Sequence, residues 1–248
     1  MAKEPKAKAA RTETPGETRV LSVIGEASLA NVVDLTLRHG SYTRRTAGSV
    51  SEARSIIGAW KPHLLLVNID VEEGRAIQLI DDRDGKQGLA VIALTRRADL
   101  RGKLDAFERG ADDYITVPLV PDDLIARTRA VLRRTHGDPG RMVPRVRIGD
   151  LEIDVLNRRV VSPQGHELHL TSLEQALLYL LAANAGTVLT REQILDALWG
   201  TDFVIESNVV DRHVRALRAK LQNDWHKPRY IETVAGTGYR FVPTGEPE

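Results

Sequence analysis

The chain has 248 residues, 42% of them hydrophobic and 28% charged, which fits one large or two ordinary domains with hydrophobic cores. Its formal net charge of +1 does not point to a polyanionic partner for the chain as a whole, so any basic surface has to be local. The absence of cysteine excludes disulfides, thiolate metal sites and cysteine nucleophiles.

The first 17 residues show no hydrophobic periodicity, so residues 1–17 are expected to form a flexible tail. They contain no apolar segment of the kind that a secretory signal needs. No apolar run elsewhere approaches the roughly 18–20 residues required to cross a bilayer. We therefore expect a cytoplasmic protein that does not enter a membrane.

Residues 18–134 alternate short apolar runs with amphipathic segments. The runs interpreted as strands are 20–24, 64–67, 91–94 and 114–117, with a more polar strand at 42–46 that would suit a sheet edge. Helical patterns lie between them, at 28–38, 50–59, 73–82, 99–109 and 121–133. Continuous apolar strands are typical of a parallel sheet with helices on both faces, so this region predicts a doubly wound, five-stranded α/β domain.

Glycine and proline concentrate at 135–144, which predicts a linker. Residues 145–244 then predict a second, α+β domain, and 245–248 a short tail. Strand patterns occur at 146–153, 159–161 and 168–170, helical patterns at 172–184, 191–198 and 208–221, and a glycine-containing hairpin at 230–242.

Ligands of a doubly wound domain gather at the carboxyl ends of the strands. The segment 110–119, Gly-Ala-Asp-Asp-Tyr-Ile-Thr-Val-Pro-Leu, resembles the closing strand and turn of bacterial response-regulator receiver domains, which share this CheY-like fold. The segment 61–68, Lys-Pro-His-Leu-Leu-Leu-Val-Asn, is similar to the part of those domains that leads to their phosphoacceptor.

This resemblance implies a phosphoacceptor pocket, but most of its chemical positions are changed here. Ile24 and Gly25 stand where two carboxylates would hold magnesium, Asn68 where the nucleophilic aspartate would be, and Val117 where a lysine would be; only Thr95 fits the family pattern. An amide does not replace a carboxylate nucleophile, and neutral side chains are poor magnesium ligands. We therefore expect a degenerate receiver without conventional aspartyl phosphorylation, with no enzymatic activity, metal or cofactor.

Two nearby carboxylates leave an alternative open, in which Asp70 or another carboxylate takes the phosphate. The interpretation that we favour is plainer: Glu26 begins a helix, and Asp70 is solvated in a loop.

In related regulators, the fourth helix, fifth strand and fifth helix form the face of a symmetric dimer. The corresponding charged residues here are Lys103, Asp112, Asp113, Arg127 and Arg129. We expect a homodimer that forms through this face without phosphate. An ordinary charged surface is the competing interpretation, because exposed ion pairs contribute only about 0–1 kcal/mol each.

The helix predicted at 208–221 is amphipathic and basic. Val210, Val214, Leu217 and Leu221 form its apolar stripe, and the opposite face carries Asn208, Arg212, Arg215, Ala216 and Ala219. One face that packs and one that presents arginine suit a helix that enters the DNA major groove, although many basic amphipathic helices are simply solvated.

The context favours DNA binding, because a strand meander, three helices and a glycine hairpin follow each other in the order of a winged helix. The motifs at 170–174, 189–195, 198–200, 210–218 and 233–240 resemble the DNA-binding domain of the OmpR/PhoB class of response regulators. The resemblance implies double-stranded DNA as a partner, with phosphate contacts from Arg191, Trp199, Arg218, Thr233, Tyr239 and Arg240.

Base reading is expected from Arg212 and Arg215, with Asn208 and His213 at the margins. Core packing competes equally with the phosphate role for Trp199 and is the favoured role of His213. Two helix caps are also predicted, Thr171 or Ser172 with Glu174, and Thr190 with Gln193.

Several departures from the class predict weak binding by each protomer. Asn208, Ala216 and Ala235 stand where relatives often carry arginine, so fewer counterions are displaced and two half-sites have to be paired. In relatives, the loop that corresponds to 201–207 can meet RNA polymerase. Asp202 and Glu206 leave this loop acidic and Phe203 apolar, which suits a protein contact, although an ordinary connection is an equal interpretation. His166, Glu167 and His169 lack the spacing of a zinc-protease helix and are rejected as a metal site.

The sequence thus predicts a dimeric, sequence-specific DNA-binding transcription regulator. Besides phosphate transfer to an unconventional carboxylate, a second alternative remains, in which the first domain senses a small ligand or another protein and thereby modulates DNA binding.

Overall fold

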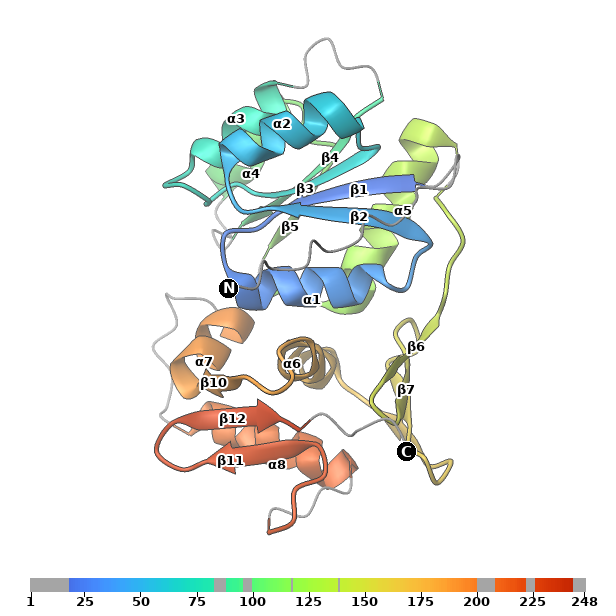
Figure 1. The fold of residues 1–248 in the computed structure, drawn as a ribbon, viewed down its shortest axis with the longest axis vertical. Helices are drawn as coiled ribbons and strands as arrows, with labels where there is room; N and C mark the ends of the chain where they lie inside the picture. Colours follow the sequence, from blue (N-terminus) through green and yellow to red (C-terminus); the bar gives the residue numbers. More distant parts are fainter. Residues whose placement is uncertain are drawn as a thin grey trace, which may run out of the picture.

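The computed structural model describes residues 18–82, 88–95, 100–116, 118–137, 139–199, 208–221 and 226–242. The tails expected at 1–17 and 245–248 and the loop 201–207 lie outside the described residues. Figure 1 shows two domains stacked along the long axis of the molecule, with the first domain at the top.

The first domain is built on a five-stranded parallel sheet, as the apolar runs predicted, and the order of its strands is β2-β1-β3-β4-β5. Its strands are β1 (Thr18–Val23), β2 (Tyr42–Ala47), β3 (Leu64–Asn68), β4 (Ala90–Thr95) and β5 (Asp113–Thr116). Every residue of β3 and β4 is buried, because helices cover both faces of the sheet. The polar strand β2 lies at an edge, as expected.

Two helices cover one face of this sheet, and the remaining helices cover the other (Figure 1). α1 (Ala27–Leu37) and α5 (Pro121–His136) lie on the side of the second domain, and their apolar residues share one core. The opposite core is closed by α2 (Val50–Trp60), the 3-10 turn η1 (Arg75–Ile77), α3 (Gln78–Asp81) and α4 (Leu100–Glu108).

Two predicted helix boundaries were wrong. The helix predicted at 73–82 starts later, at η1, because Glu72, Glu73 and Gly74 adopt the left-handed region, with φ of 53°, 60° and 90°. Such φ values interrupt a right-handed helix. α5 runs beyond residue 133 to His136 and ends at Gly137, whose φ of 73° terminates it.

The second domain contains the predicted strand meander, three helices and hairpin. The meander comprises β6 (Arg145–Ile148), β7 (Leu151–Asp154), β8 (Arg159–Val161) and β9 (Glu167–His169), all antiparallel. The strand pattern at 146–153 is therefore two strands, separated by the turn at Gly149. The helices are α6 (Ser172–Ala183), α7 (Arg191–Trp199) and α8 (Val209–Leu221), and a small sheet joins β10 (Val188–Thr190), β12 (Gly238–Phe241) and β11 (Ile231–Val234).

Both predicted helix caps are present. Thr171 Oγ1 accepts a hydrogen bond from the Glu174 amide, and the Glu174 carboxylate accepts one from the Thr171 amide. Thr190 and Gln193 exchange the same pair of bonds at α7. These reciprocal bonds satisfy amide groups that helix geometry leaves unpaired.

The described part of the predicted linker is held against the first domain. Val143 donates its amide proton to the His39 carbonyl at 2.7 Å, and Gly40 pairs with Met142 in an isolated antiparallel bridge. Arg129 donates to the Gly140 carbonyl at 3.0 Å, and the Tyr42 hydroxyl donates to the Pro139 carbonyl at 3.0 Å.

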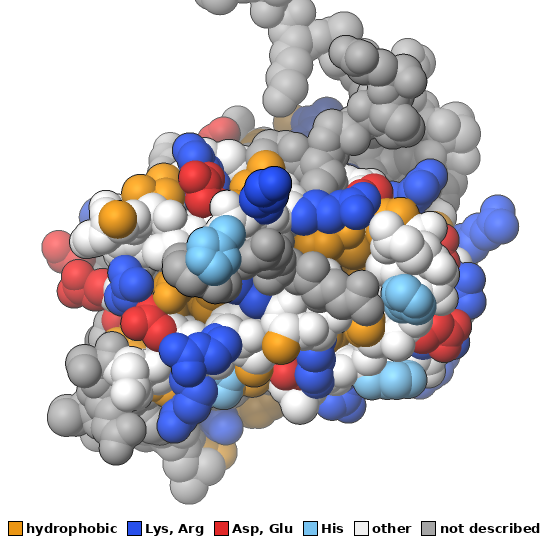
Figure 2. Space-filling model, turned by 90° about the horizontal axis from the view of Figure 1, so that it is seen from below, with side chains coloured by type: hydrophobic (Ala, Val, Ile, Leu, Met, Phe, Trp, Pro, Cys, Tyr) orange, Lys and Arg blue, Asp and Glu red, His pale blue; other side chains and the backbone are white. Residues whose placement is uncertain are grey.

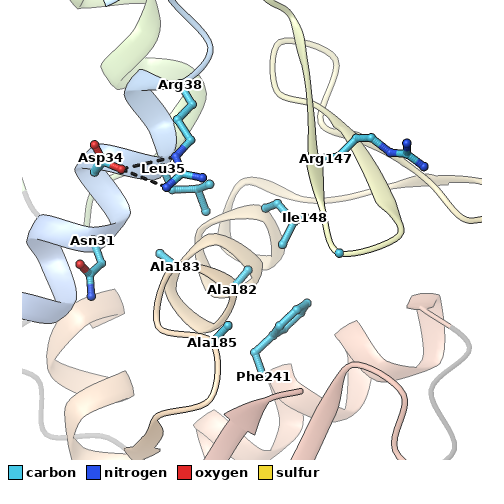
Figure 3. A pocket seen from close by; sticks show the side chains of 11 residues that line it. Asn31, Asp34, Leu35, Arg38, Arg147, Ile148, Ala182, Ala183, Ala185 and Phe241 are labelled. Carbon is cyan, nitrogen blue, oxygen red and sulfur yellow. Dashed lines mark hydrogen bonds and ion pairs between the residues drawn. The ribbon is translucent and has the colours of Figure 1, made fainter. Parts of the chain in front are cut away.

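The two domains meet where α1 packs against α6 (Figure 1). Asn31 Nδ2 donates to Asn184 Oδ1 at 2.9 Å, and Asn184 Nδ2 donates in turn to the Ser28 carbonyl. Beside this contact lies a cavity of about 290 Å³ between α1, the β6–β7 turn and the end of α6. Its lining residues include Leu35, Ile148, Ala182 and Phe241 (Figure 3).

His39 makes a second, fully buried contact between the domains. Its Nδ1 lies 2.9 Å from the Val143 carbonyl and its Nε2 lies 2.5 Å from the Tyr179 hydroxyl. A carbonyl only accepts hydrogen bonds, so Nδ1 carries the proton and the tyrosine hydroxyl donates to Nε2. Burial lowers the pKa of His39, which keeps the ring neutral.

Candidate functional site

The crevice at the carboxyl ends of β1, β3 and β4 contains the predicted degenerate pocket. Ile24, Asn68 and Thr95 are all buried, and a side chain at Gly25 would press against Val71, since a Cβ there would lie 3.1 Å from the valine. Val117, the fifth predicted pocket residue, lies outside the described residues.

Asp70 is not the solvated loop residue that the sequence led us to expect. The Thr95 hydroxyl lies 2.9 and 3.1 Å from the two carboxylate oxygens of Asp70, and it donates to this carboxylate. Asn68 Oδ1 accepts the Asp70 amide at 3.0 Å, which turns the loop back over the strand ends. The amide of Asn68 and the hydroxyl of Thr95 thus both hold Asp70.

Glu26 has the helix-start position that we expected. It is the residue before α1, with an extended backbone, and its Oε1 accepts a hydrogen bond from the Ser28 hydroxyl at 2.5 Å. A carboxylate at this end of a helix is favoured by the helix dipole.

The crevice opens into a cavity of about 1220 Å³ beside α4. Its described lining contains the carboxylates Asp70, Glu73, Asp105 and Glu108 and no basic side chain. The carboxylates of this described part of the lining repel a phosphoryl group. Within the described ranges, no group of three or more His, Asp or Glu residues is placed to hold a metal ion.

The five residues of the predicted dimer face have contacts within the protomer. Arg127 bridges Asp113 at 3.0 Å and Asp123 at 2.9 Å, and Lys103 lies over the Tyr114 ring at 5.5 Å. Asp112 accepts the Val91 amide, and Arg129 holds the Gly140 carbonyl. Asp112 therefore has a structural role at the β4–β5 junction, and Arg129 has one at the linker.

α8 has the two faces that its sequence predicted. Val210, Val214, Leu217 and Leu221 are buried, whereas Asn208, Arg212, Arg215, Ala216 and Ala219 are exposed. Asn208 precedes the helix, and its carbonyl accepts the Arg212 amide at 3.0 Å. The domain contact between α1 and α6 leaves the arginine face of α8 open to solvent.

Figure 2 views the molecule from the side of the second domain. Lys and Arg side chains are spread over this face with acidic side chains between them, rather than gathered in one continuous basic patch. This distribution agrees with the near-zero net charge of the chain.

Four of the six predicted phosphate-binding residues lie together around the Tyr239 ring. The guanidinium groups of Arg191 and Arg218 lie over this ring, at 5.1 and 5.4 Å from its centre. Arg218 also donates to the Thr233 hydroxyl at 2.8 Å and to the Ile231 carbonyl. Arg218 thereby fastens α8 to β11.

The structure does not bring Arg240 and Trp199 into this group. Arg240 is adjacent to Tyr239 on β12, so its side chain points to the other face of the hairpin, where it pairs with Glu232 at 2.6 Å. Trp199 packs against His213, with ring centres 5.3 Å apart. Burial, together with the charge of Arg212, lowers the pKa of His213, which agrees with the packing role favoured for it.

Sequence reasoning missed two carboxylates in this region, Asp211 and Glu232. Asp211 accepts hydrogen bonds from Arg191 Nε at 2.8 Å and from the Tyr239 hydroxyl at 2.5 Å. Burial alone would raise its pKa, but these two hydrogen bonds and the charge of Arg191 lower it below the ordinary value. Its place in the first turn of α8 was the only sequence signal.

Comparison with known proteins gives matches to both domains. A family model described as "Transcriptional regulatory protein, C terminal" matches residues 165–241. The DNA-binding response regulator MtrA of Mycolicibacterium smegmatis is 34% identical over 91% of this chain and 97% of its own length. The response regulator ArlR of Staphylococcus epidermidis is 35% identical over 90% and 98% of the two chains.

Among solved structures, the response regulator DrrB, an OmpR/PhoB homologue from Thermotoga maritima, is 28% identical, with 91% of this chain and 99% of that chain covered and a TM-score of 0.44. The RstA DNA-binding domain of Klebsiella pneumoniae, solved with the RstA box, is 32% identical, with 41% and 99% covered and a TM-score of 0.37.

Proposed function

Because this chain belongs to the OmpR/PhoB family of DNA-binding response regulators, we propose that it regulates transcription as a dimer that reads specific DNA sequences without aspartyl phosphorylation. The observation that carries the proposal is α8, whose arginine face is exposed while its apolar stripe is buried. A helix of this kind fits the width of the major groove.

Arg212 and Arg215 are the proposed base readers. Both are exposed, and each guanidinium can donate two hydrogen bonds to guanine, worth about 1–3 kcal/mol of discrimination per base pair. Exposed Asn208 at the start of the helix lies at the margin of this set, and packed His213 is the weakest member.

Arg191, Tyr239 and Thr233 are the proposed backbone contacts. They come from α7, β12 and β11. Arg191 and Arg218 lie over the Tyr239 ring, and Arg218 donates to the Thr233 hydroxyl. Contacts of this kind fix the position of the protein on the duplex without reading sequence. Arg218 contributes mainly by holding the hairpin in place, whereas Arg240 and Trp199 are secondary members.

Independence from phosphorylation is supported by the crevice of the first domain. Asn68 is neutral, Ile24 and Gly25 supply no carboxylate, and the Thr95 hydroxyl already donates to Asp70. A phosphoryl group would have to displace this carboxylate and enter an acidic cavity. The interaction with Thr95 also disfavours Asp70 as an alternative phosphoacceptor.

Dimerisation through α4, β5 and α5 is supported by two exposed apolar side chains on α4. Leu104 is 51% exposed and Phe107 is 47% exposed, and their spacing of three places them on one side of the helix. Burying them against a second copy would gain hydrophobic free energy. Arg127 could then exchange its partner Asp113 for the same residue of the second protomer.

Two measurements test the proposal. Titration with beryllofluoride and magnesium, which mimics an acyl phosphate, should leave the mass in sedimentation and the DNA affinity of the full chain unchanged. Genome-wide mapping of bound DNA should return a repeated half-site. Stoichiometric labelling by acetyl phosphate would refute phosphate independence, and equal binding to all duplexes would refute sequence recognition.

The cavity between α1 and α6 favours one second candidate, a regulator whose DNA binding responds to a small ligand. It combines apolar side chains with the polar Asn31 and the charged Asp34, Arg38 and Arg147 at a domain junction, which is a common place for ligand sites (Figure 3). A thermal-shift screen with metabolites supports this candidate if one compound raises the melting temperature of the wild type but not of a variant with Ala182→Phe, which fills the cavity.

A further inference from the structure

Asp211 is the point at which three elements of the second domain are joined. It lies in the first turn of α8 and accepts hydrogen bonds from Arg191 of α7 and from Tyr239 of β12. The same two residues are stacked on each other, with the guanidinium carbon 5.1 Å from the ring centre. Their positions are therefore fixed by one carboxylate.

The contact also holds Arg191 in place while its side chain stays accessible to another partner. Arg191 donates its Nε–H to Asp211, and its side chain is 37% exposed. A guanidinium that is held in this way has lost rotational freedom before it binds. It therefore loses less conformational entropy when it binds a phosphate.

The negative charge of Asp211 by itself weakens DNA binding, whereas the ordering of Arg191 strengthens it. Its side chain is 39% exposed and lies on the helix that also carries Arg212 and Arg215. A carboxylate near a DNA surface repels phosphates, so Coulomb's law alone predicts that neutralising it strengthens DNA binding.

We propose that Asp211 is a positioning residue for the DNA backbone contact, which orients Arg191 and the Tyr239 hydroxyl for phosphate binding. The inference rests on the proposed function, in which α8 and the hairpin bind duplex DNA. It adds that a negatively charged residue on the binding helix increases affinity, because the order that it imposes outweighs the repulsion that it causes.

The test compares Asp211→Asn with Glu192→Gln in the full chain. Both variants remove one negative charge, but the Glu192 side chain is exposed on α7 and forms no hydrogen bond or ion pair with the side chains of Arg191 and Tyr239. The probe is a short duplex of mixed sequence, titrated at several salt concentrations. This probe measures backbone binding and needs no knowledge of the operator.

Asp211→Asn should bind several-fold more weakly than wild type, and the slope of log K against log salt should fall by about 0.9 for each phosphate contact that is lost. Glu192→Gln should bind as tightly as wild type or more tightly. In an Arg191→Ala background, Asp211→Asn should have a much smaller effect. Stoichiometric titration measures the fraction of each protein that is active in DNA binding. If Asp211 had a merely structural role, the salt slope of this active fraction would be the same in Asp211→Asn and wild type.

Each outcome bears on one claim. Affinity of Asp211→Asn equal to or above that of wild type, with an unchanged slope, would overturn the positioning role while leaving DNA binding intact. Absence of duplex binding by the wild type itself would instead overturn the proposed function. Circular dichroism and thermal melting establish that each variant is folded at the temperature of the titration.

Discussion

Thr95 and Asp70 pair with each other in the crevice of the first domain, where two strands end. Thr95 is almost fully buried at the end of β4, and Asp70 follows β3, so the hydrogen bond joins neighbouring strands at the point where a ligand would enter. A buried hydroxyl requires a partner, and here the chain provides one. The Thr95 hydroxyl therefore has a hydrogen-bond partner without a phosphoryl group.

The coupling between these residues should be measurable. Thr95→Val and Asp70→Ala should each reduce the free energy of unfolding, and the double variant should lose less than the sum, with a coupling of about 1 kcal/mol. Urea denaturation of the four proteins gives this value. Additive losses would mean that the hydrogen bond adds no stability in solution.

A single arginine is expected to control part of the sequence preference. Replacing Arg215 with alanine should weaken discrimination at one base pair by about 1–3 kcal/mol. Selection of binding sites from a random duplex pool, performed with both proteins, measures the change. Arg54→Ala is the matched control, because this exposed arginine lies on α2, on the face of the first sheet that is turned away from the second domain (Figure 1). An unchanged preference in Arg215→Ala would remove it from the set of base readers.

The start of α6 is held both by its own capping box and by a contact from another helix. Glu174 closes the capping box with Thr171, and Lys220 of α8 donates to the same carboxylate at 2.7 Å. The carboxylate therefore secures its own helix and the helix that carries the proposed base readers. Burial would raise the pKa of Glu174, but the hydrogen bonds from Lys220 and Thr171 bring it below the ordinary value.

Because the folded pKa of Glu174 is depressed, its contribution to stability is present above the unfolded pKa of about 4.3 and is lost as the pH falls through the lower folded value. Glu174→Gln should therefore reduce the free energy of unfolding at neutral pH by about 1–2 kcal/mol. The difference from wild type should shrink below about pH 4.

Denaturant titrations at several pH values provide the check. Glu167→Gln is the control, because Glu167 pairs with Arg159 at the surface, where its side chain is 51% exposed and contributes little. A loss in Glu174→Gln that does not depend on pH would contradict the assignment.

At the scale of the whole molecule, the second domain packs directly against the first. α1 packs on α6, Asn31 bonds to Asn184, and His39 reaches the buried Tyr179 hydroxyl. Arg158 adds an ion pair with Asp122 at the start of α5, at 3.0 Å. The apolar residues of both domains form one continuous core across this junction. No helix among the described residues is long and apolar enough to span a membrane.

This continuity predicts that the two domains unfold together. Calorimetry of the wild type should give one transition, and His39→Gln should split or broaden it, because the ring links the domains through Val143 and Tyr179. His63→Gln, a change within the first domain, should keep a single transition. Two separate transitions in the wild type would contradict a fixed junction.

The pKa of His39 predicts how the stability of the wild type and of His39→Gln depends on pH. Its folded pKa is lowered by burial, although the nearby carbonyls of Val143 and Pro144 and the charge of Asp154 partly offset this. The stability it contributes is complete above the unfolded pKa of about 6.5 and is lost as the pH falls below it, because the unfolded state binds the proton more readily. Between about pH 7 and pH 5, His39→Gln should lose less stability than wild type.

The sequence by itself determined both domain folds, the two faces of α8 and the loss of charged groups at Ile24, Gly25 and Asn68. Hydrophobic periodicity and residue identity are local properties, so they can be read from neighbouring letters. The same reasoning located the caps at Thr171 and Thr190, since a capping box joins residues only three apart.

Only the tertiary structure decided the contacts between distant residues. His39 meets Tyr179 across 140 positions of sequence, Asp211 meets both Arg191 and Tyr239, and Thr95 meets Asp70 at neighbouring strand ends. Each of these polar groups had several possible partners along the chain. The choice was made by the packing of the sheet and helices, which brings a donor and an acceptor together where water is excluded.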